Sequence, residues 1–468
     1  MGDEQKRASG KKDGKEKTTQ GSESFLTKND IIISAISDIQ TIFMHAVSAV
    51  HPVQLIRRHV QVKDTSTILI SGDEYVLPPQ GRLIVLGAGK AAAAMAQELE
   101  KVLEGHIRPE GLVVTKHGHA LPLQHLVLLE AGHPVPDQHS VEASRRFLEI
   151  AATAGVQDLV ILLLSGGASS LLADVPEGST LEDVQQLFSL LLKSGAGIHE
   201  MNIVRKHLSK IKGGWLAQNI YPATLCSLVL SDVVGDDLSV IGSGPAVPDP
   251  STFADTIAIL EKYRLLALIP YSLREYLHDG MAGTIPDTPK AGDAVFARVR
   301  HYLAGTNHIA LEAAADKARS LGYHTQILAA DTTGDAHTVA ETLIAAARHY
   351  QGPRPGCLLM GGETTVQVTG DGKGGRNQQL ALAAAIALDG QTGITLLSAG
   401  TDGTDGPTNA AGAIVDAYTL KKAASLQLDP QQFLQQQDAW TFFSKAGGLL
   451  ITGPTQTNVM DLMIVLLT

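Results

Sequence analysis

The chain has 468 residues, more than one hydrophobic core usually accommodates, so we expect two or three domains of ordinary size. Apolar residues make up 44% of the chain and charged residues 18%, which is the balance of a globular protein. The net charge of −11 disfavours nucleic acid and anionic membranes as partners, because both require a basic face. A small anionic substrate is compatible with this charge, since a local group of lysines and arginines can oppose it.

Two cysteines, Cys226 and Cys357, lie inside apolar runs and are expected to be buried thiols in a reducing compartment. Residues 1–27 are polar and rich in glycine, serine and lysine, which predicts a disordered tail. This segment lacks the apolar core of a secretory signal, and its acids disfavour a transit peptide. No uncharged apolar stretch reaches the ~18 residues of a membrane span. We therefore expect a cytoplasmic protein, rather than a mitochondrial one, without membrane attachment.

Strands alternating with helices are predicted for residues 28–285, which we assign to a first domain with a mostly parallel, doubly wound sheet. The run DLVILLL at 158–164 is continuously apolar, as in a central strand buried on both faces. Further strands are predicted at 82–86, 111–115, 126–130 and 224–230. Helices are predicted at 29–50, 91–103, 139–154, 181–192 and 202–218. Ligands of such sheets bind at the carboxyl ends of the strands.

Glycine, proline and aspartate dominate residues 279–292, where we place the domain boundary. A second α/β series follows over residues 293–468. Helices are predicted at 310–321 and 336–349, and a strongly apolar helix begins near Arg376. Strands are predicted at 325–329, 394–398, 448–452 and 461–467.

The turn GAGKAA at residues 87–92 matches the G-x-G-x-x-G/A pattern between a strand and a helix. A dinucleotide site requires an acid at the end of the next strand, but that strand is followed by Lys116. The helix dipole disfavours a lysine at a helix start, so Lys90 indicates a bound anion, held with Gly87 and Gly89. The alternative is a solvent-exposed lysine beside a tight turn.

The sequence SGGASS at 165–170 follows the most apolar strand of the chain. Ser165, Gly166, Gly167 and Ser169 predict a nest of the size of a phosphate or carboxylate. The G-x-S-x-G pattern of a nucleophilic serine is absent, which disfavours acyl transfer. The alternative is a turn whose hydroxyl groups cap the next helix.

Four of the 37 lysines and arginines fall within eight positions, 205–212. Helical spacing would place Lys206 and Lys210 on one face, and would align Arg205 with Lys212 after two turns. In an acidic protein this positive stripe predicts anion binding by Arg205, Lys206 and Lys212. The alternative is a solvated helix face.

Residues 361–388 combine an acid, a glycine-rich loop and a helix start. Free backbone N–H groups, the helix dipole and the charge of Arg376 together predict a site for a phosphate or carboxylate. We expect the other polar glycine loops to converge on this one. The predicted binding residues are Glu363, Gly374, Gly375 and Asn377.

Three aspartates follow predicted strands and are candidates for acid–base or metal chemistry. Asp232 would act as a base or hold Mg²⁺ through water, unlike its neighbours, which can cap a turn. Asp402 and Asp405 lie three residues apart, and Mg²⁺ is usually held by one or two carboxylates with phosphate oxygens and water. Turn-forming aspartates are the alternative. Three loop histidines are interpreted as structural or solvated: His117, His119 and His133.

Nine short motifs, in this order, resemble the class II glycerate kinases, whose C-terminal part is the MOFRL domain. They are LGAGKA, LLSGGASSLL, VRKHLSKIKGG, LSDVVGDD, GSGPAVPDPST, GGETTV, GGRNQ, GTDGTDGPT and GPTQTNVMD. The resemblance begins near residue 28 and runs to the end of the sequence. It implies a Rossmann-like N-terminal domain over 28–285, a smaller α/β domain over 293–468 with MOFRL near 355–465, and an active site in the cleft between them.

The resemblance also implies phosphorylation of D-glycerate that depends on ATP and Mg²⁺, with 2-phosphoglycerate favoured over 3-phosphoglycerate. By motif, the cleft lysine of the family falls on Lys90 and its glycine-loop arginine on Arg376; these would clamp the substrate carboxylate and the phosphoryl group. Asp232 would orient or deprotonate the attacking hydroxyl, and Asp402 with Asp405 would position Mg²⁺. No G-x-x-x-x-G-K-[ST] sequence is present, so the nucleotide site must be built differently.

Two other functions are weighed against the kinase. An NAD(P)H-dependent hydroxypyruvate reductase would use the GAGKAA turn, but the missing ribose acid argues against it. A non-catalytic metabolite sensor would keep the cleft without turnover. The predicted partners are the small molecules D-glycerate and ATP, and the oligomeric state stays open between monomer and homodimer.

Overall fold

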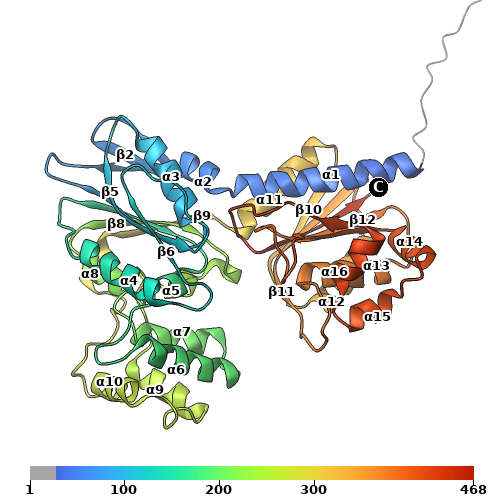
Figure 1. Ribbon diagram of the computed structural model, residues 1–468. Coiled ribbons are helices and arrows are strands. Elements are labelled where there is room, and N and C mark those ends of the chain that lie inside the picture. The colour runs from blue at the N-terminus through green and yellow to red at the C-terminus, as the bar shows by residue number, and fades with distance from the viewer. Residues whose placement is uncertain (1–27) are drawn as a thin grey trace, which may run out of the picture.

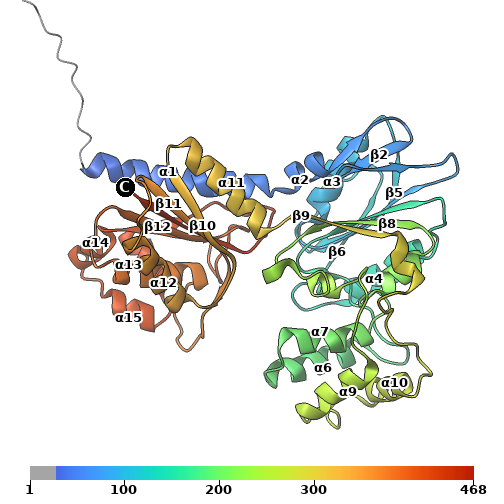
Figure 2. The ribbon, with the colours of Figure 1, turned by 180° about the vertical axis from the view of Figure 1, so that it is seen from behind.

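The computed structural model describes residues 28–468, so the predicted tail at 1–27 lies outside the described residues. Two α/β bodies lie side by side, each built on one central sheet, and a helical unit adjoins the first of them (Figure 1). The long helix α1 (Lys28–Ala49) runs along the second body (Figure 2). These two bodies confirm the predicted α/β fold class with two sheets.

The first sheet has six strands, and all of its neighbouring pairs are parallel. Across the sheet the strands are β6 (Val127–Ala131), β5 (Pro109–Lys116), β4 (Leu83–Ala88), β7 (Leu159–Leu164), β8 (Thr224–Leu230) and β9 (Val299–Gly305). In chain order this is the doubly wound 3-2-1-4-5-6 arrangement of dinucleotide-binding folds. The strand order reverses between β4 and β7, so the ligand crevice is expected beside the carboxyl ends of these two strands.

Helices cover both faces of this sheet because its strands are apolar on both sides. On one face α2 (Pro52–His59) and α3 (Ala92–Leu103) share a core with Val85 and Ile161. On the other face α4 (Gln138–Ala151) and α8 (Trp215–Ile220) share a core with Ile84 and Leu162. A small antiparallel sheet adjoins α3; its strands are β1 (Val60–Val62), β2 (Thr67–Ile70) and β3 (Asp73–Val76).

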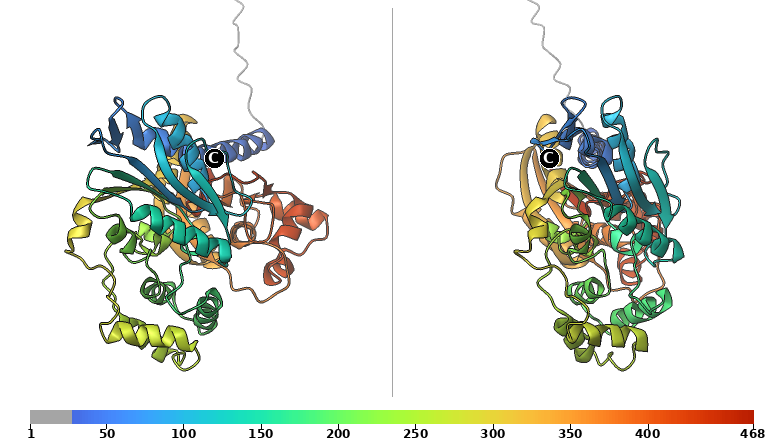
Figure 3. Two further views of the ribbon diagram at one scale, coloured as in Figure 1. Left: turned by 60° about the vertical axis from the view of Figure 1, so that its left-hand side comes forward. Right: turned by 90° about the vertical axis from the view of Figure 1, so that its left-hand side faces the viewer.

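Four helices form a separate unit beneath both sheets in the views of Figure 3. They are α6 (Leu181–Lys193), α7 (Ile198–His207), α9 (Phe253–Lys262) and α10 (Tyr271–Met281). Their apolar faces enclose a core of their own, which includes Leu187, Leu260 and Leu273. The connections between the strands and this unit contain α5 (Ala168–Leu171) and the 3-10 turns η1 (Val234–Asp236), η2 (Ile241–Ser243) and η3 (Ala294–Arg298).

The predicted helix at 202–218 is wrong, because the chain forms two helices there. Helix α7 ends at His207, and α8 begins only at Trp215. Gly213 and Gly214 between them have φ angles of +58° and +87°. These left-handed conformations break the helix, so helical spacing does not relate the basic residues on its two sides.

The second sheet is mixed, with only its β10–β11 pair parallel. Its order is β10 (His324–Asp335), β11 (Gly356–Thr365), β15 (Asp461–Leu467), β12 (Ile394–Gly400), β13 (Gly412–Asp416) and β14 (Leu449–Leu450). The last strand, β15, lies in the middle and is antiparallel to both neighbours.

Helices cover this sheet on both faces as well. Helices α1 and α11 (Asn307–Ser320) share one core with Leu359 and Leu466, which lie on one face of the sheet. On the other face, Leu358 and Val465 lie in a second core. That core also receives α12 (Ala336–Arg348), α13 (Arg376–Leu388), α14 (Thr419–Ser425), α15 (Pro430–Gln435) and α16 (Ala439–Ala446). Cys226 and Cys357 are free and buried in the two sheets, as predicted.

Two elements correct the predicted domain boundary at 279–292. Strand β9 follows that segment, yet it forms the edge of the first sheet by pairing with β8. Helix α1 precedes the first body but packs on α11 and β15 of the second. The segment at 279–292 instead connects the helical unit back to the first sheet. Strand β9 was not predicted because it is only partly buried, which weakens its apolar pattern.

Among residues 28–468, no single helix is long and apolar enough to cross a membrane. The neighbouring helical segments 34–49 and 52–59 are long and apolar enough only when they are taken together, and they are bent by 51° relative to each other.

Candidate active site

A cavity of about 380 Å³ lies between the two bodies, at the carboxyl ends of β4, β5, β7 and β8. This is the crevice that the strand order predicts, and its volume is typical of a small-molecule site. Its polar lining comes from Lys90, Lys116, His119, Ser165 and Gly166 of the first body and from Asp402, Thr404, Gln456, Thr457 and Asn458 of the second.

The loop after β7 occupies the backbone donors of the turn after β4. The Lys90 amide donates to the carbonyl oxygen of Gly166 at 3.0 Å, and the Ala91 amide donates to Ser165 Oγ at 3.1 Å. Ser165 Oγ therefore accepts a hydrogen bond from the start of α3, and its contact with a ligand stays a prediction. The backbone of the two loops forms one packed unit, from which the half-buried side chain of Lys90 reaches the cavity.

Gly87 and Gly89 serve this packing, which corrects their predicted role in anion binding. A Cβ atom on Gly89 would lie 2.0 Å from Ser165 Oγ, and one on Gly87 would lie 3.2 Å from the side chain of Val113. A larger side chain at either position would crowd these atoms, which explains why glycine occupies both positions.

A group of basic side chains surrounds the first-body side of the cavity. Lys90 and Lys116 form no ion pair with any acid among residues 34–468, whose side chains the structure describes. His133 lies against Gly167, where a Cβ atom would be 2.8 Å from the imidazole ring. Burial, and then the charges of Lys90, Lys116 and His119, lower the pKa of His133 to about 4, so its ring is neutral at pH 7.

Sequence reasoning missed Lys116, His119 and His133 as candidate site residues. Lys116 ends β5 and His119 follows it, whereas His133 comes shortly after the end of β6. The rule that drew attention to Lys90, a polar residue at the carboxyl end of a parallel strand, applies equally to these three.

Asp232 follows β8 and lies against the β7 loop. A Cβ atom on Gly166 would be 1.7 Å from Asp232 Oδ2, so only glycine leaves room for this carboxylate. From the second body, Asn458 Nδ2 donates to the same oxygen at 3.4 Å. The two bodies therefore meet at Asp232, which the sequence analysis selected as a catalytic residue.

The environment of Asp232 raises the pKa of its carboxyl group to about 6. Burial is the main cause. The charge of Lys90 opposes the rise, while the negative charges of Glu363 and Asp402 add to it. Acids from both bodies thus crowd around one lysine, an arrangement typical of functional sites.

Arg376 begins α13 and is held by two acids. Its Nε and Nη2 donate to the two carboxylate oxygens of Asp461 at 2.6 and 3.0 Å, and Nη1 donates to Glu363 at 2.6 Å. Asp461 is completely buried, so this bidentate pair fixes the guanidinium. An arginine has five N–H donors, so two stay available for a ligand.

The two predicted metal ligands, Asp402 and Asp405, have different environments. Asp405 is only 3% exposed, and its two carboxylate oxygens accept the backbone N–H groups of Asn377 at 3.1 Å and Gln378 at 2.8 Å. Asp405 is therefore a helix cap, which corrects its assignment as a metal ligand. Asp402 lines the cavity, and its Oδ1 accepts the amide of Thr404 at 2.9 Å.

The anion predicted at the start of α13 is thus the carboxylate of Asp405. A Cβ atom on Gly375 would lie 2.3 Å from Asp405 Oδ1, and Gly374 lies against the backbone at the start of α16. Asn377 is buried and accepts the hydroxyl of Ser398 at 2.7 Å. Gly374, Gly375 and Asn377 therefore support the start of α13, and their contact with a ligand stays a prediction.

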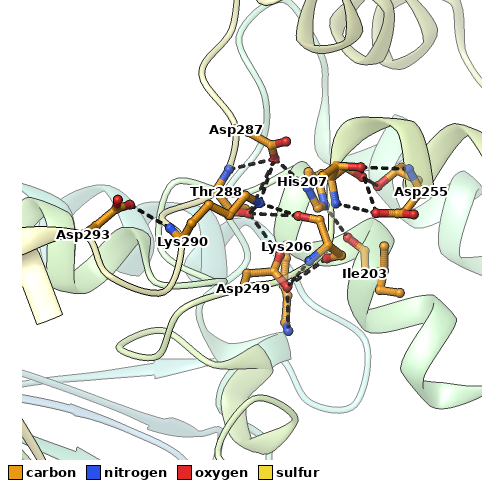
Figure 4. Close-up of polar contacts among 12 residues, drawn as sticks. Ile203, Lys206, His207, Asp249, Asp255, Asp287, Thr288, Lys290 and Asp293 are labelled. Atoms are coloured by element: carbon orange, nitrogen blue, oxygen red, sulfur yellow. Dashed lines mark hydrogen bonds and ion pairs between the residues drawn. The ribbon is translucent and has the colours of Figure 1, made fainter.

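Two lysines of the predicted basic stripe are buried in ion pairs. Lys206 Nζ lies 3.3 Å from Asp249 Oδ1, within the polar network of Figure 4. Lys212 Nζ donates to the carbonyl oxygen of Leu172 at 2.6 Å and pairs with Asp174. Their charges are already neutralised, which corrects their assignment to anion binding. A larger cavity of about 750 Å³ beside this network, between α8, α9 and α10, is lined by none of the predicted site residues.

Arg205 differs from these lysines, because no acid of residues 28–468 forms an ion pair with it. Its Nη1 donates to Asn202 Oδ1 at 3.3 Å, and its guanidinium lies 4.9 Å from the centre of the Phe188 ring. Asn202 also accepts Ser243 Oγ, which is 2.9 Å from Ser169 Oγ. Arg205 and Ser169, both predicted to bind an anion, thus belong to one network.

The chain matches two sequence families. Residues 38–278 match a domain of unknown function, DUF4147, and residues 356–461 match the MOFRL family.

Three similar proteins cover most of the chain. The D-glycerate 2-kinase of Thermotoga maritima is 44% identical over 82% of this chain and 90% of its own length. A putative hydroxypyruvate reductase of Agrobacterium vitis is 42% identical over 83% of this chain and 88% of its own. A crystal structure of glycerate kinase from Thermotoga maritima has a TM-score of 0.83 at 40% identity, covering 93% of this chain and 100% of that one.

Asp405→Ala is expected to lower the free energy of unfolding by about 2–4 kcal/mol, because two buried amides of α13 lose their acceptor. Asp429→Ala removes an exposed cap from α15 and should cost only about 0.5–1 kcal/mol. Urea unfolding followed by circular dichroism measures both. Equal losses in the two variants would contradict the buried cap.

Proposed function

Because the chain belongs to the glycerate kinases that carry a C-terminal MOFRL domain, we propose that it transfers the terminal phosphoryl group of ATP to the 2-hydroxyl of D-glycerate. The observation that carries the proposal is one cavity between two bodies, with Lys90 and Lys116 on one side and Asp402 on the other. The choice of the 2-hydroxyl rests on the relatives from Thermotoga maritima and Pyrococcus horikoshii, which are named glycerate 2-kinases.

Phosphoryl transfer depends mainly on positioning and on neutralising the charge that is spread over the phosphoryl oxygens. Lys90 and the two remaining N–H groups of Arg376 hold the glycerate carboxylate and the transferring phosphoryl group. Asp232 accepts the proton of the attacking hydroxyl. Its pKa of about 6 suits this role, because the carboxylate is ionised at neutral pH yet more basic than an ordinary aspartate.

The acids of the cavity fit Mg²⁺, which we propose as the required cofactor. Carboxylate oxygens are its preferred protein ligands. Burial raises the pKa of Asp232, and the negative charges of Glu363 and Asp402 add to this rise, which supports a position for a cation among these acids. Asp402 would hold the ion directly and Asp232 through water. When bound, Mg²⁺ would reduce the negative charge of the phosphate oxygens.

A hydroxypyruvate reductase is the second candidate, because two relatives carry that name. Its NAD(P)H would place the pyrophosphate on the amides at the start of α3. In this structure the amides of Lys90 and Ala91 donate to the β7 loop instead. Strand β5 also ends in Lys116, where NAD requires an acid. Both observations favour the kinase.

The deciding experiment measures ADP release from ATP in the presence of Mg²⁺ and D-glycerate, with phosphorus NMR of the product. The proposal predicts ADP together with 2-phosphoglycerate; 3-phosphoglycerate would overturn the choice of hydroxyl. Hydroxypyruvate with NADH or NADPH should give no cofactor oxidation, and robust oxidation would favour the reductase. Glycerate binding without ADP release would indicate a sensor.

Lys90→Ala is expected to lower kcat/KM at least about 100-fold, equivalent to about 2.7 kcal/mol of transition-state stabilisation. The matched control is Lys193→Ala, on the exposed side of α6, which should keep wild-type activity. Steady-state ADP release with both substrates varied gives the values. Near-wild-type activity in a folded Lys90→Ala variant would remove this residue from the mechanism.

Asp402→Asn is expected to raise the Mg²⁺ concentration that gives half-maximal activity about tenfold or more, because the ion loses a charged ligand. Activity is measured against Mg²⁺ at saturating ATP and glycerate. Asp371→Asn, an exposed acid of the loop before α13, is the control and should leave this concentration unchanged. An unaltered Mg²⁺ dependence in Asp402→Asn would count against its role.

The kcat/KM of the wild-type protein is expected to fall as the pH decreases through about 6. Protonation removes the base, and the raised pKa of Asp232 puts this loss near pH 6 rather than near pH 4. Activity is therefore present above the pKa and lost below it. Asp232→Asn should be slow at every pH and lack this acidic limb. A flat wild-type profile between about pH 5 and pH 8 would exclude Asp232 as the base.

A further inference from the structure

Three side chains near the cavity form a separate cluster that the kinase reaction does not use. His117 follows the end of β5, Asp137 caps α4, and His139 lies in the first turn of that helix. One nitrogen of each imidazole and one carboxylate oxygen all lie within 4.8 Å of one another. The side chains of His117, Asp137 and His139 are 49%, 36% and 71% exposed, so an ion can reach them from solvent.

The spacing of these atoms is close to that of a metal site. Zn²⁺ binds histidine nitrogen and carboxylate oxygen at about 2.0–2.1 Å with tetrahedral angles, which places neighbouring ligand atoms about 3.3 Å apart. His139 Nδ1 is 3.4 Å from Asp137 Oδ2, and His117 Nε2 is 2.7 Å from the same oxygen. The first distance is close to the tetrahedral spacing and the second is shorter, so binding an ion requires at least a rotation of the exposed His117 ring.

The capping bonds of α4 hold the carboxylate of Asp137 in place. Its Oδ1 accepts the amides of Gly132 and Ser140 at 3.1 and 3.0 Å, so Oδ2 alone faces the two histidines. Hydrogen bonds behind a ligand orient it and strengthen its bond to the metal. The two imidazole rings meet edge to face, with centres 5.4 Å apart, and both lie beside Oδ2.

We propose that His117, Asp137 and His139 form an open site for a late first-row divalent metal ion, of which Zn²⁺ is the best match. Two imidazole nitrogens and one carboxylate oxygen suit Zn²⁺, whereas Mg²⁺ prefers oxygen alone. Water completes the coordination. Each histidine binds as neutral imidazole, and any proton between His117 and Asp137 passes to solvent.

The ion would fasten the loop after β5 to α4. His117 lies between Lys116 and His119, both of which line the cavity. Without metal, the loop is held by Glu130, whose carboxylate accepts the amides of Gly118 and Ala120. A metal bridge therefore restrains a cavity wall. Any effect on glycerate phosphorylation rests on the proposed function, whereas metal binding is independent of it.

The test is calorimetric titration of untagged protein with Zn²⁺ in excess Mg²⁺, together with the absorption spectrum of the Co²⁺ form. We expect one ion per chain and the visible bands of Co²⁺ bound to nitrogen and oxygen. His117→Ala and His139→Ala should each weaken binding at least about 100-fold. His125→Ala, an exposed histidine elsewhere on the same body, should bind as the wild type does.

Absence of stoichiometric Zn²⁺ binding, or equal affinity in all three variants, would overturn the site. Hydrogen exchange supplies a second readout, in which Zn²⁺ slows exchange over residues 117–121 of the wild type but not of His139→Ala. Unchanged exchange in the wild type would overturn the fastening of the loop. Neither measurement uses kinase activity, so a failure of the proposed function would leave both results interpretable.

Discussion

The packing of the β7 loop on the β4 turn is the constraint on which the site depends. Gly89 meets Ser165 there, Gly166 meets Asp232, and the amide of Lys90 donates into the loop. The backbone donors that other proteins of this strand order offer to a dinucleotide are consumed within the protein. The turn presents the charged side chain of Lys90 to the cavity instead of free backbone N–H groups. It therefore lacks the backbone donors with which related folds bind a dinucleotide.

At several positions that could bind an anion, the basic group or helix start binds a carboxylate of the protein itself. Asp405 occupies the start of α13, Asp249 pairs with the buried Lys206, and Asp461 holds Arg376 by two bonds. Burying a charge is costly unless it is paired, so such pairs are expected in the interior. Charges that keep no partner within residues 34–468, such as that of Lys90, therefore stand out as candidates for contact with a substrate.

The cavity exists because the two bodies are joined at several points. Helix α1 belongs to the second body and leads directly into α2 of the first, while β9 leads back into α11. Near the cavity, Thr457 Oγ1 donates to the carbonyl oxygen of Val50 at the end of α1, at 2.6 Å. Asn458, its neighbour, contacts Asp232. The negative charges of Glu363 and Asp402 in the second body thus act on Asp232 of the first across this interface.

Apolar patterning was enough to find most strands of the two large sheets and the longest helices beside them, because long buried elements carry strong periodic signals. It did not find the short helices α2, α14, α15 and α16, nor α9 and α10 of the helical unit. Polar residues that come shortly after a predicted strand gave the candidates Lys90, Asp232 and Asp402. The first two follow parallel strands, whose carboxyl ends converge, whereas Asp402 follows β12, which is antiparallel to its neighbours. Apolar patterning failed for the edge strand β9, which is only partly buried, and for the predicted helix at 202–218, which Gly213 and Gly214 interrupt.

The sequence by itself therefore determined the two α/β bodies and part of the charge at the cavity, namely that of Lys90 and Asp402 but not that of Lys116. Only the tertiary structure decided which charges are free, because pairing depends on neighbours that are distant in the chain. Lys206 and Asp405 look like Lys90 and Asp402 in sequence, yet Asp249 neutralises the first and α13 binds the second. Buried charges must be paired, and the partners that pair with Lys206 and Asp405 lie too far away in the chain for the local sequence to reveal them.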